Sequence, residues 1–399
     1  MNAPIPLDQA QARLLALAEP LAAEELPLAA AAERYLAEPL AARRTQPPAD
    51  LSAMDGYAIR GDDLVGPWTV IGESAAGHPF ERELAPGQAA RISTGALMPR
   101  DAGAVLLQEN AARDGDRLSL NGEGDPSPGH VRRAGFDFRE GDALLSVGTR
   151  LGPAHLALAL SGGHASARVH ALPSLAVLDN GDELAADPAN CAPGQIPASN
   201  GAMLAAMAVP HVASIVRLGP VPDRLEAMTA ALDAAGDADV IVTSGGASVG
   251  DHDLVRPALE AWGAKLDFWR VAIKPGKPLL VARKGTQVVL GLPGNPVSTF
   301  VTAQLFLLPL LRKLGGAANP SPRMIAAQLH GSLPAGGPRL EFLRARWQEG
   351  RLRPITQQDS SALRSLAMAE ALIERPIGAP AASDGDPVRA FPLDNGGIA

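Results

Sequence analysis

Glycines, hydroxyls and charged side chains directly follow predicted strands in the second half of the chain. The longest such segment, residues 244–253, reads SGGASVGDHD. Glycines after a strand let backbone N–H groups approach an anion, and Ser244 and Ser248 add hydroxyl donors. Asp251 and Asp253 are two residues apart, so both could reach a hard cation that bridges the anion. A glycine-rich turn that ends in a helix N-cap is the alternative interpretation.

Two lysines lie three residues apart in a second loop, residues 273–278, which reads IKPGKP. The proline and glycine between Lys274 and Lys277 stiffen the loop. The two ammonium groups would then form a fixed pair of charges for a phosphate or another oxyanion. Solvent-exposed loop lysines are the alternative interpretation.

Two further loops follow strands in the same way. Residues 181–184 read GDEL, and paired carboxylates there can hold a cation or accept a hydrogen bond from a ribose or a pterin. A turn with a helix N-cap explains this segment equally well. Residues 292–296 read LPGNP, a rigid turn into a helix that is by itself more typical of structure than of chemistry.

A sheet must bring these loops together, and the sequence predicts one between Ser174 and Leu314. Apolar strand patterns alternate there with helical patterns, which is typical of a doubly wound parallel sheet with an α/β fold. Such sheets bind ligands outside the carboxyl ends of their strands, where all four loops would meet. The predicted strands are 174–178, 212–216, 239–243, 268–273 and 288–290, and the predicted helices are 199–208, 223–235, 254–262 and 296–314.

The regions on either side of this α/β part have other patterns. Helices are predicted at 8–18 and 22–41, and a further helical segment at 148–162. Between them, short apolar stretches recur about every ten residues, which is typical of an inserted all-β module. A β pattern returns after Pro320. The predicted domains are 1–46 with 138–172, the inserted β module 47–137, the α/β domain 173–316 and a C-terminal β domain 317–399.

The composition excludes several classes of protein. The chain has 399 residues, of which 46% are hydrophobic and 20% charged, so disorder is not its dominant state. The net charge of −8 and the aromatic content of 4% argue against nucleic acid as a partner. The single cysteine, Cys191, excludes an internal disulfide framework. No signal peptide is evident, and the longest apolar run is too short for a membrane span, so a soluble cytoplasmic protein is expected.

The β module also carries polar side chains at turns. Three segments, SAMDGYA (52–58), STGA (93–96) and RRAGFD (132–137), each fit a surface turn when taken alone. Taken with the four loops, they indicate an acidic and basic cleft for an anionic, nucleotide-like ligand with a divalent metal.

Seven segments in this order resemble the MoeA family, the molybdopterin molybdenumtransferases related to the gephyrin E domain. They are the three segments of the β module together with GDEL (181–184), TSGGASVGDHD (243–253), AIKPGKP (272–278) and GLPGNP (291–296). The resemblance implies a molybdopterin-binding α/β domain, an inserted β module and a C-terminal β barrel. It also implies a homodimer, with the site between the α/β domain of one subunit and the β module of the other.

The resemblance implies a reaction in molybdenum cofactor biosynthesis. Molybdenum from molybdate is inserted into adenylylated molybdopterin, with Mg²⁺-dependent release of AMP. The alternative is a non-catalytic carrier that binds the molybdopterin cofactor and delivers it to a target enzyme. The expected partners are the pterin, molybdate, other cofactor-biosynthesis proteins and molybdoenzymes.

The resemblance also implies roles for the matching residues. The expected catalytic residues are Asp55, Asp137, Asp253, Lys274 and Lys277, with the lysines holding molybdate. The expected Mg²⁺ ligands are Asp55, Asp253 and Glu183. The residues expected to bind molybdopterin are Thr94, Gly95, Asp182, Glu183, Ser244, Gly245, Gly246, Ser248, Gly250, Pro293, Gly294, Asn295 and Pro296.

The chain departs from the usual family pattern at several positions. Asp179 and Asn180 stand where Ser-Thr usually precedes GDEL, and Ala198 replaces an aspartate. Leu51 stands in place of an asparagine and Arg270 in place of a lysine. The loss of one carboxylate and the gain of another are expected to retune the ligand pocket or to reflect drift. A divergent paralogue with altered activity would show such changes.

Overall fold

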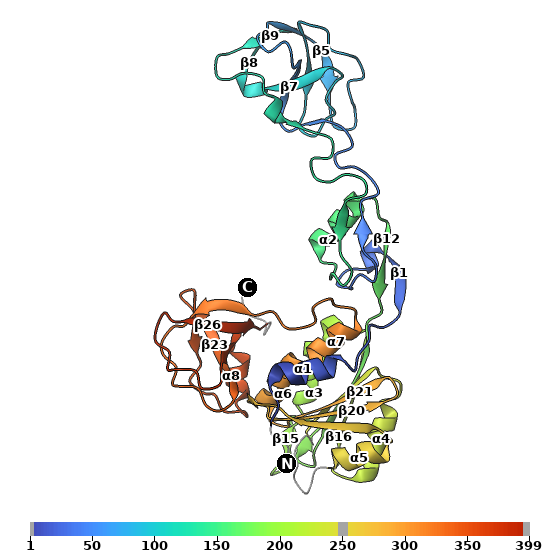
Figure 1. Cartoon of the computed structure of the whole chain (residues 1–399), viewed down its shortest axis with the longest axis vertical. Coiled ribbons are helices and arrows are strands. Elements are labelled where there is room, and N and C mark those ends of the chain that lie inside the picture. The colour runs from blue at the N-terminus through green and yellow to red at the C-terminus, as the bar shows by residue number, and fades with distance from the viewer. Residues whose placement is uncertain (1–3, 246–253, 394–399) are drawn as a thin grey trace.

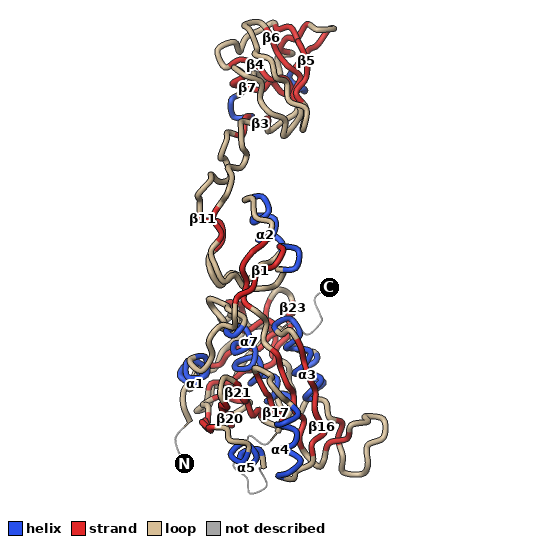
Figure 2. Tube along the Cα trace, turned by 90° about the vertical axis from the view of Figure 1, so that its right-hand side faces the viewer, coloured by secondary structure: helices blue, strands red, loops and turns tan. Residues whose placement is uncertain are grey.

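The computed structural model of the protein describes residues 4–245 and 254–393. The molecule is elongated (Figure 1). A β module lies at one end, a slender middle region follows, and an α/β domain and a C-terminal β domain lie together at the other end (Figure 2). We propose that these groups of elements are domains with the boundaries given above.

The middle region is built from segments far apart in the sequence. Strand β1 (Ala23–Pro27) pairs antiparallel with β12 (Ser166–His170), and β2 (Leu40–Ala41) pairs with β11 (Ala143–Leu145). Helix α2 (Pro153–Ser161) packs beside them and confirms the predicted helical segment. The predicted helix 22–41 is wrong. Pro27 and Pro39 interrupt any helix there, and pairing with distant strands overrides the local helical preference of the alanines.

The β module confirms the all-β pattern. Its central strand β4 (Gly56–Arg60) buries Ala58 in one hydrophobic cluster and Ile59 in another, as the two-residue period of a strand requires. Both faces of the sheet are therefore covered. The sheet order is β7 (Ala102–Leu107), β4, β6 (Gln88–Ile92), β5 (Trp68–Ser74), β9 (Arg117–Leu120) and β8 (Ala111–Asp114).

The α/β domain contains a mixed sheet. Its order is β16 (Ser214–Val221), β13 (Ser174–Asn180), β17 (Val240–Ser244), β21 (Gln287–Leu292), β20 (Pro278–Lys284) and β18 (Lys265–Arg270). The four strands β16, β13, β17 and β21 are parallel to one another. Strand β20 pairs antiparallel with both β21 and β18. The prediction of a wholly parallel sheet is therefore wrong at this edge. The connections to β20 are too short for a crossover helix, and Gly285 turns directly from β20 into β21 with φ of +61°.

Helices cover both faces of this sheet, which confirms the doubly wound architecture. On one face, α1 (Leu7–Leu15), α3 (Asn200–Ala208) and the helix 296–314 pack against Val177 and Val242. On the other face, α4 (Leu225–Ala234) and α5 (Val255–Ala261) pack against Leu178 and Ile241. The helix 296–314 consists of α6 (Pro296–Thr302), a π-helical turn (Ala303–Leu307) and α7 (Leu308–Leu314).

By length and composition alone, the helix 296–314 could cross a membrane. However, 83% of its 18-residue apolar stretch is buried inside the protein. Burial of this kind is what the central helix of a folded core requires, and the helix forms much of the largest hydrophobic cluster.

The C-terminal domain is a small barrel that is joined to the α/β domain through a shared strand. Strand β19 (Ile273–Lys274) leaves the α/β domain and pairs in parallel with β23 (Leu340–Gln348). A bridge between Leu329 and Leu352 links the end of β22 (Ile325–Gln328) to β24 (Arg351–Pro354) and closes the ring. The remaining elements are α8 (Leu363–Ala367), β25 (Ala371–Arg375) and β26 (Pro387–Pro392).

Candidate functional site

A cavity of about 1080 Å³ lies between the α/β domain and the C-terminal domain, at the carboxyl ends of the parallel strands. The described parts of all four predicted loops reach it. The predicted ligand-binding residues that line it are Glu183, Ser244, Gly245, Pro293, Gly294, Asn295 and Pro296, and both Lys274 and Lys277 also line it. The parallel strands thus bring together segments that are more than 100 residues apart in the sequence.

One side of the cavity is formed by the end of β13. Asp179 on β13 is the register partner of Ser244 on β17, and both are buried. Burial raises the pKa of Asp179, and the Gly201 amide, the Arg217 charge and the Ser244 hydroxyl oppose this rise. A Cβ on Gly201 would overlap the Oδ2 atom of Asp179, so only glycine fits beside this carboxyl group.

Asp182 does not line the cavity. It is exposed, and its Oδ1 atom accepts a hydrogen bond from the Asp223 amide at 3.0 Å. Asp182 therefore serves the turn, which is the alternative interpretation of the GDEL segment. Its neighbour Glu183 reaches the cavity.

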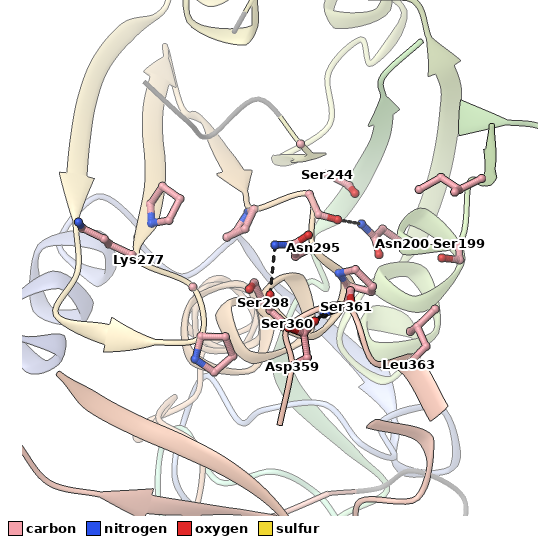
Figure 3. Close-up of a pocket in the computed structure, with 18 of the residues that line it drawn as sticks. Ser199, Asn200, Ser244, Lys277, Asn295, Ser298, Asp359, Ser360, Ser361 and Leu363 are labelled. Atoms are coloured by element: carbon pink, nitrogen blue, oxygen red, sulfur yellow. Dashed lines mark hydrogen bonds between the residues drawn. The ribbon is translucent and has the colours of Figure 1, made fainter. Parts of the chain in front are cut away.

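The opposite side of the cavity is cationic. Lys277 and Asn200 lie on opposite sides, with Ser244 and Asn295 between them (Figure 3). Lys274 forms an ion pair with Glu341, and Arg339 donates a hydrogen bond to the Ile273 carbonyl at 3.3 Å. The cavity therefore has a positive end, which suits an oxyanion.

The C-terminal domain contributes a loop, residues 357–361, that sequence reasoning did not assign to the site. Asn295 Nδ2 donates a hydrogen bond to Ser360 Oγ at 3.2 Å, although this asparagine occupies the N-cap position of α6 (Figure 3). Its amide thus links two domains instead of capping the helix. The loop is separated from every other segment of the site in the sequence, and no spacing pattern points to it. Its polar composition, QQDSS, is the one available signal.

The turn 292–296 is held by side chains on both sides. Asn200 Nδ2 donates to the Gly294 carbonyl at 2.7 Å, and Thr299 Oγ1 donates to the Pro293 carbonyl at 2.5 Å. A Cβ on Gly294 would lie 3.7 Å from the Cα of Gly245, so two strand-end loops nearly touch there. These contacts hold the turn in place, and its residues 293–296 line the cavity.

Comparison with known proteins decides the family. Models named MoeA N-terminal region (domain I and II), Probable molybdopterin binding domain and MoeA C-terminal region (domain IV) match residues 5–163, 176–313 and 326–393. A molybdopterin molybdenumtransferase of Haemophilus influenzae is 38% identical over 314 residues, which is 78% of either chain. The one of Bacillus subtilis is 34% identical over 94% of this chain and 91% of its own. The chain belongs to the MoeA family.

The fold of this MoeA chain agrees with solved structures. The molybdopterin biosynthesis MoeA protein of Pyrococcus horikoshii superposes with a TM-score of 0.82 at 28% identity, over 98% of this chain and 100% of that one. The predicted resemblance and the predicted fold class are thereby confirmed.

Several residues expected at the site of this MoeA chain lie in the β module, far from the cavity (Figure 1). Asp55 Oδ1 accepts a hydrogen bond from the Thr94 amide at 2.6 Å, and this bond lowers the pKa of Asp55. Gly95 continues the same turn with φ of +81°. Asp137 is exposed near the base of the module. One chain therefore gathers Asp55, Thr94 and Gly95 but does not bring them to Lys274.

The remaining predicted residues, Gly246, Ser248, Gly250 and Asp253, lie outside the described residues. Within residues 4–245 and 254–393, no group of three or more His, Cys, Asp or Glu side chains is placed to hold a metal ion. Of the expected Mg²⁺ ligands, Glu183 lines the cavity, while Asp55 directly precedes β4 in the β module, which lies at the other end of the molecule (Figure 1).

Proposed function

We propose that this MoeA chain inserts molybdenum from molybdate into adenylylated molybdopterin and releases AMP. One observation carries the proposal: the cavity joins the strand-end loops of a probable molybdopterin-binding domain to a cationic end formed by Lys274, Lys277 and Arg339. The relatives named molybdopterin molybdenumtransferase support it.

The two ends of the cavity would serve the two substrates. Lys277 and Lys274 attract the molybdate dianion and hold it near the dithiolene sulfurs. Ser244 and the backbone around Gly245 and Gly294 face the pterin and its phosphate. Two Mo–S bonds form to the dithiolene while one Mo–O bond breaks, and that oxygen leaves as water with the two thiol protons. A second water molecule adds across the phosphoanhydride bond, which releases AMP and leaves the phosphate on the molybdenum-loaded pterin.

The expected Mg²⁺ set does not fit the described residues of a single chain, because Asp55 and Glu183 lie in different domains. A second copy of the chain would bring the β module of one subunit to the cavity of the other. We therefore propose a homodimer whose site is completed between subunits. Bound there by Glu183 and the partner's carboxylates, Mg²⁺ would neutralise the charge of the pyrophosphate linkage.

Cytoplasmic location and contacts with other cofactor-biosynthesis proteins and molybdoenzymes belong to the same proposal. The cofactor that such a reaction forms must pass to an enzyme that uses it.

The test is AMP release from adenylylated molybdopterin and Mg²⁺, measured with and without molybdate. The wild-type chain should release AMP in a molybdate-dependent manner, and Lys277→Ala should need far more molybdate. Lys265→Ala is a matched control, because Lys265 is an exposed lysine that pairs with Arg283 at the opposite end of the sheet. Tight binding of adenylylated molybdopterin without AMP release would contradict the proposal and favour a non-catalytic carrier of the cofactor.

A further inference from the structure

Three buried oxygen atoms on one side of the cavity have no hydrogen-bond partner among the described residues. They are the Oδ1 atoms of Asp179, Asn180 and Asn200. All three residues line the cavity, and only 5% of Asp179 and 8% of Asn180 is exposed. We define these three residues as the acceptor patch.

The patch is held in place by its surroundings. Asn200 donates its Nδ2 hydrogen to the Gly294 carbonyl, which orients the amide and leaves Oδ1 as the unused acceptor. Asp179 is fixed beside Gly201, where a larger residue would not fit. Asn180 packs against Gly245, since a Cβ on that glycine would lie 3.3 Å from Asn180 Nδ2. The acceptors are therefore preorganised.

Unpartnered buried acceptors are unfavourable in the free protein. Each one costs about 1–3 kcal/mol of desolvation when no donor replaces water. Burial also raises the pKa of Asp179, which reports the same cost for the ionised carboxyl group. Most buried polar atoms in proteins have partners, so a group of three at the wall of a cavity indicates a ligand that supplies N–H or O–H donors.

The cavity is electrically asymmetric. The acceptor patch offers oxygen atoms without hydrogens. Lys277, which lies opposite Asn200 (Figure 3), offers positive charge together with Arg339 beside Ile273. A ligand that fits both sides carries clustered donors at one end and an anion at the other. A pterin has such an end, because its 2-amino group and ring N3–H point the same way.

We propose that the acceptor patch binds the donor edge of the pterin ring, its 2-amino group and N3–H, and that Asp179 determines specificity for it. This inference rests on the proposed function and adds the orientation of the substrate. The pterin ring lies toward β13 and α3, and its anionic groups lie toward Lys277. The unpartnered Oδ1 atom of Asp179 can accept one charge-assisted hydrogen bond from the 2-amino group, and the Asn180 and Asn200 oxygens are further acceptors beside it.

The test compares the binding of pterin and of lumazine, in which a carbonyl replaces the 2-amino group, to the full-length chain. Wild type should bind pterin at least about tenfold more tightly than lumazine, as expected for one charge-assisted hydrogen bond. Asp179→Asn should reduce this preference to about threefold or less, because the neutral amide cannot make a charge-assisted hydrogen bond. Asp179→Ser provides a second variant of smaller volume.

Asp237→Asn is the matched control, because Asp237 is exposed and precedes β17 at the opposite end of the sheet from the cavity. It should keep the wild-type preference. Binding of AMP is measured in parallel, because a nucleoside also carries N–H and O–H donors.

Equal affinity of the wild type for pterin and lumazine overturns the inference. So does a variant that loses affinity for AMP but keeps the preference for pterin. If wild type prefers pterin, Asp179→Asn removes the preference and no AMP is released in the assay above, the proposed function fails while the pterin contact stands.

Discussion

The Nζ atom of Lys274 lies 2.9 Å from the Oε1 atom of Glu341, and this ion pair joins the α/β domain to the C-terminal domain. The two residues are register partners on the parallel strands β19 and β23. The lysine side chain is 53% exposed and the glutamate 17%. Glu341 therefore holds the lysine at the rim of the cavity and also competes with any oxyanion for its charge.

Glu341→Gln should increase affinity for molybdate by about threefold to tenfold, as expected when a competing carboxylate is removed from a partly exposed lysine. Thermal stability should change little, since ion pairs this exposed contribute about 0–1 kcal/mol. Molybdate titration by calorimetry measures the effect. Glu349→Gln, on an exposed turn of the same domain, is the control. Weaker molybdate binding would mean that Glu341 mainly positions the lysine.

The part of the site that follows strands could be predicted from the sequence. Ser244 and Gly294 come after apolar strands, and parallel strands place such loops at one edge of a sheet. Asp179 lies on the same edge. The sequence shows it as a departure from the family pattern but does not indicate where in the site it lies. Its burial depends on Gly201, which lies 22 residues later and whose role only the packing reveals.

Other features could not be predicted because distant contacts determine them. The alanine-rich segment 22–41 has local helical preference, but β1 pairs with β12 more than 130 residues away. Ser360 reaches the cavity only because β19 pairs with β23 and brings two domains together. Asp55 belongs to a recognisable motif, yet one chain holds it away from the cavity.

Asp55→Ala and Lys277→Ala should each abolish or strongly reduce AMP release, and a mixture of the two variants should regain activity. Asp55 directly precedes β4 in the β module and Lys277 lines the cavity, and these two parts lie at opposite ends of the molecule (Figure 1). A site that needs both residues must therefore combine two subunits. After subunit exchange, half of the dimers are mixed and one of their two sites is intact, which gives about a quarter of wild-type activity. AMP release after co-refolding or co-expression measures this.

Asp55→Ala alone, taken through the same co-refolding procedure, is the control for that experiment and should stay inactive. Asp55 is exposed and outside the hydrophobic clusters, so its replacement should leave the fold unchanged. Failure of the two variants to complement each other, in dimers shown to be mixed, would contradict a site shared between subunits.

Arg344 supports the cavity from behind, and only 1% of it is exposed. Its guanidinium donates to the carbonyls of Asp359 and Gln357 at 3.0 Å each, which fixes the loop that carries Ser360. Arg344→Met should leave both carbonyls without this donor and lower the free energy of unfolding by about 2 kcal/mol. Molybdate affinity should fall as well, because the loop loosens.

Chemical denaturation and molybdate titration of the same samples measure both effects of Arg344→Met. Arg346→Met is the matched control, since Arg346 is an exposed arginine two residues further along β23. A loss of stability with unchanged ligand binding would show that the arginine serves the barrel alone.

His211 makes the stability of the α/β domain sensitive to acid. It is 7% exposed, and its Nε2 atom lies 3.5 Å from the Arg312 guanidinium. Burial, with the nearby charges of Arg312 and Arg150, lowers the pKa of His211 to about 3. The folded protein therefore keeps this ring neutral while the unfolded chain, with an ordinary histidine pKa near 6.5, takes up a proton below that pH.

Because the unfolded state binds the proton first, the stability that His211 supplies is complete above about pH 6.5 and is lost as the pH falls toward 3. At about pH 4.5 the loss should reach roughly 3 kcal/mol, because each pH unit below the unfolded pKa contributes about 1.36 kcal/mol. His211→Asn should remove this contribution, so its free energy of unfolding should fall less steeply than that of wild type between about pH 7 and pH 4.5. Urea unfolding at several pH values measures the difference, with His78→Asn on the exposed surface of the β module as the control. Parallel pH profiles for His211→Asn and wild type would contradict a neutral, buried His211.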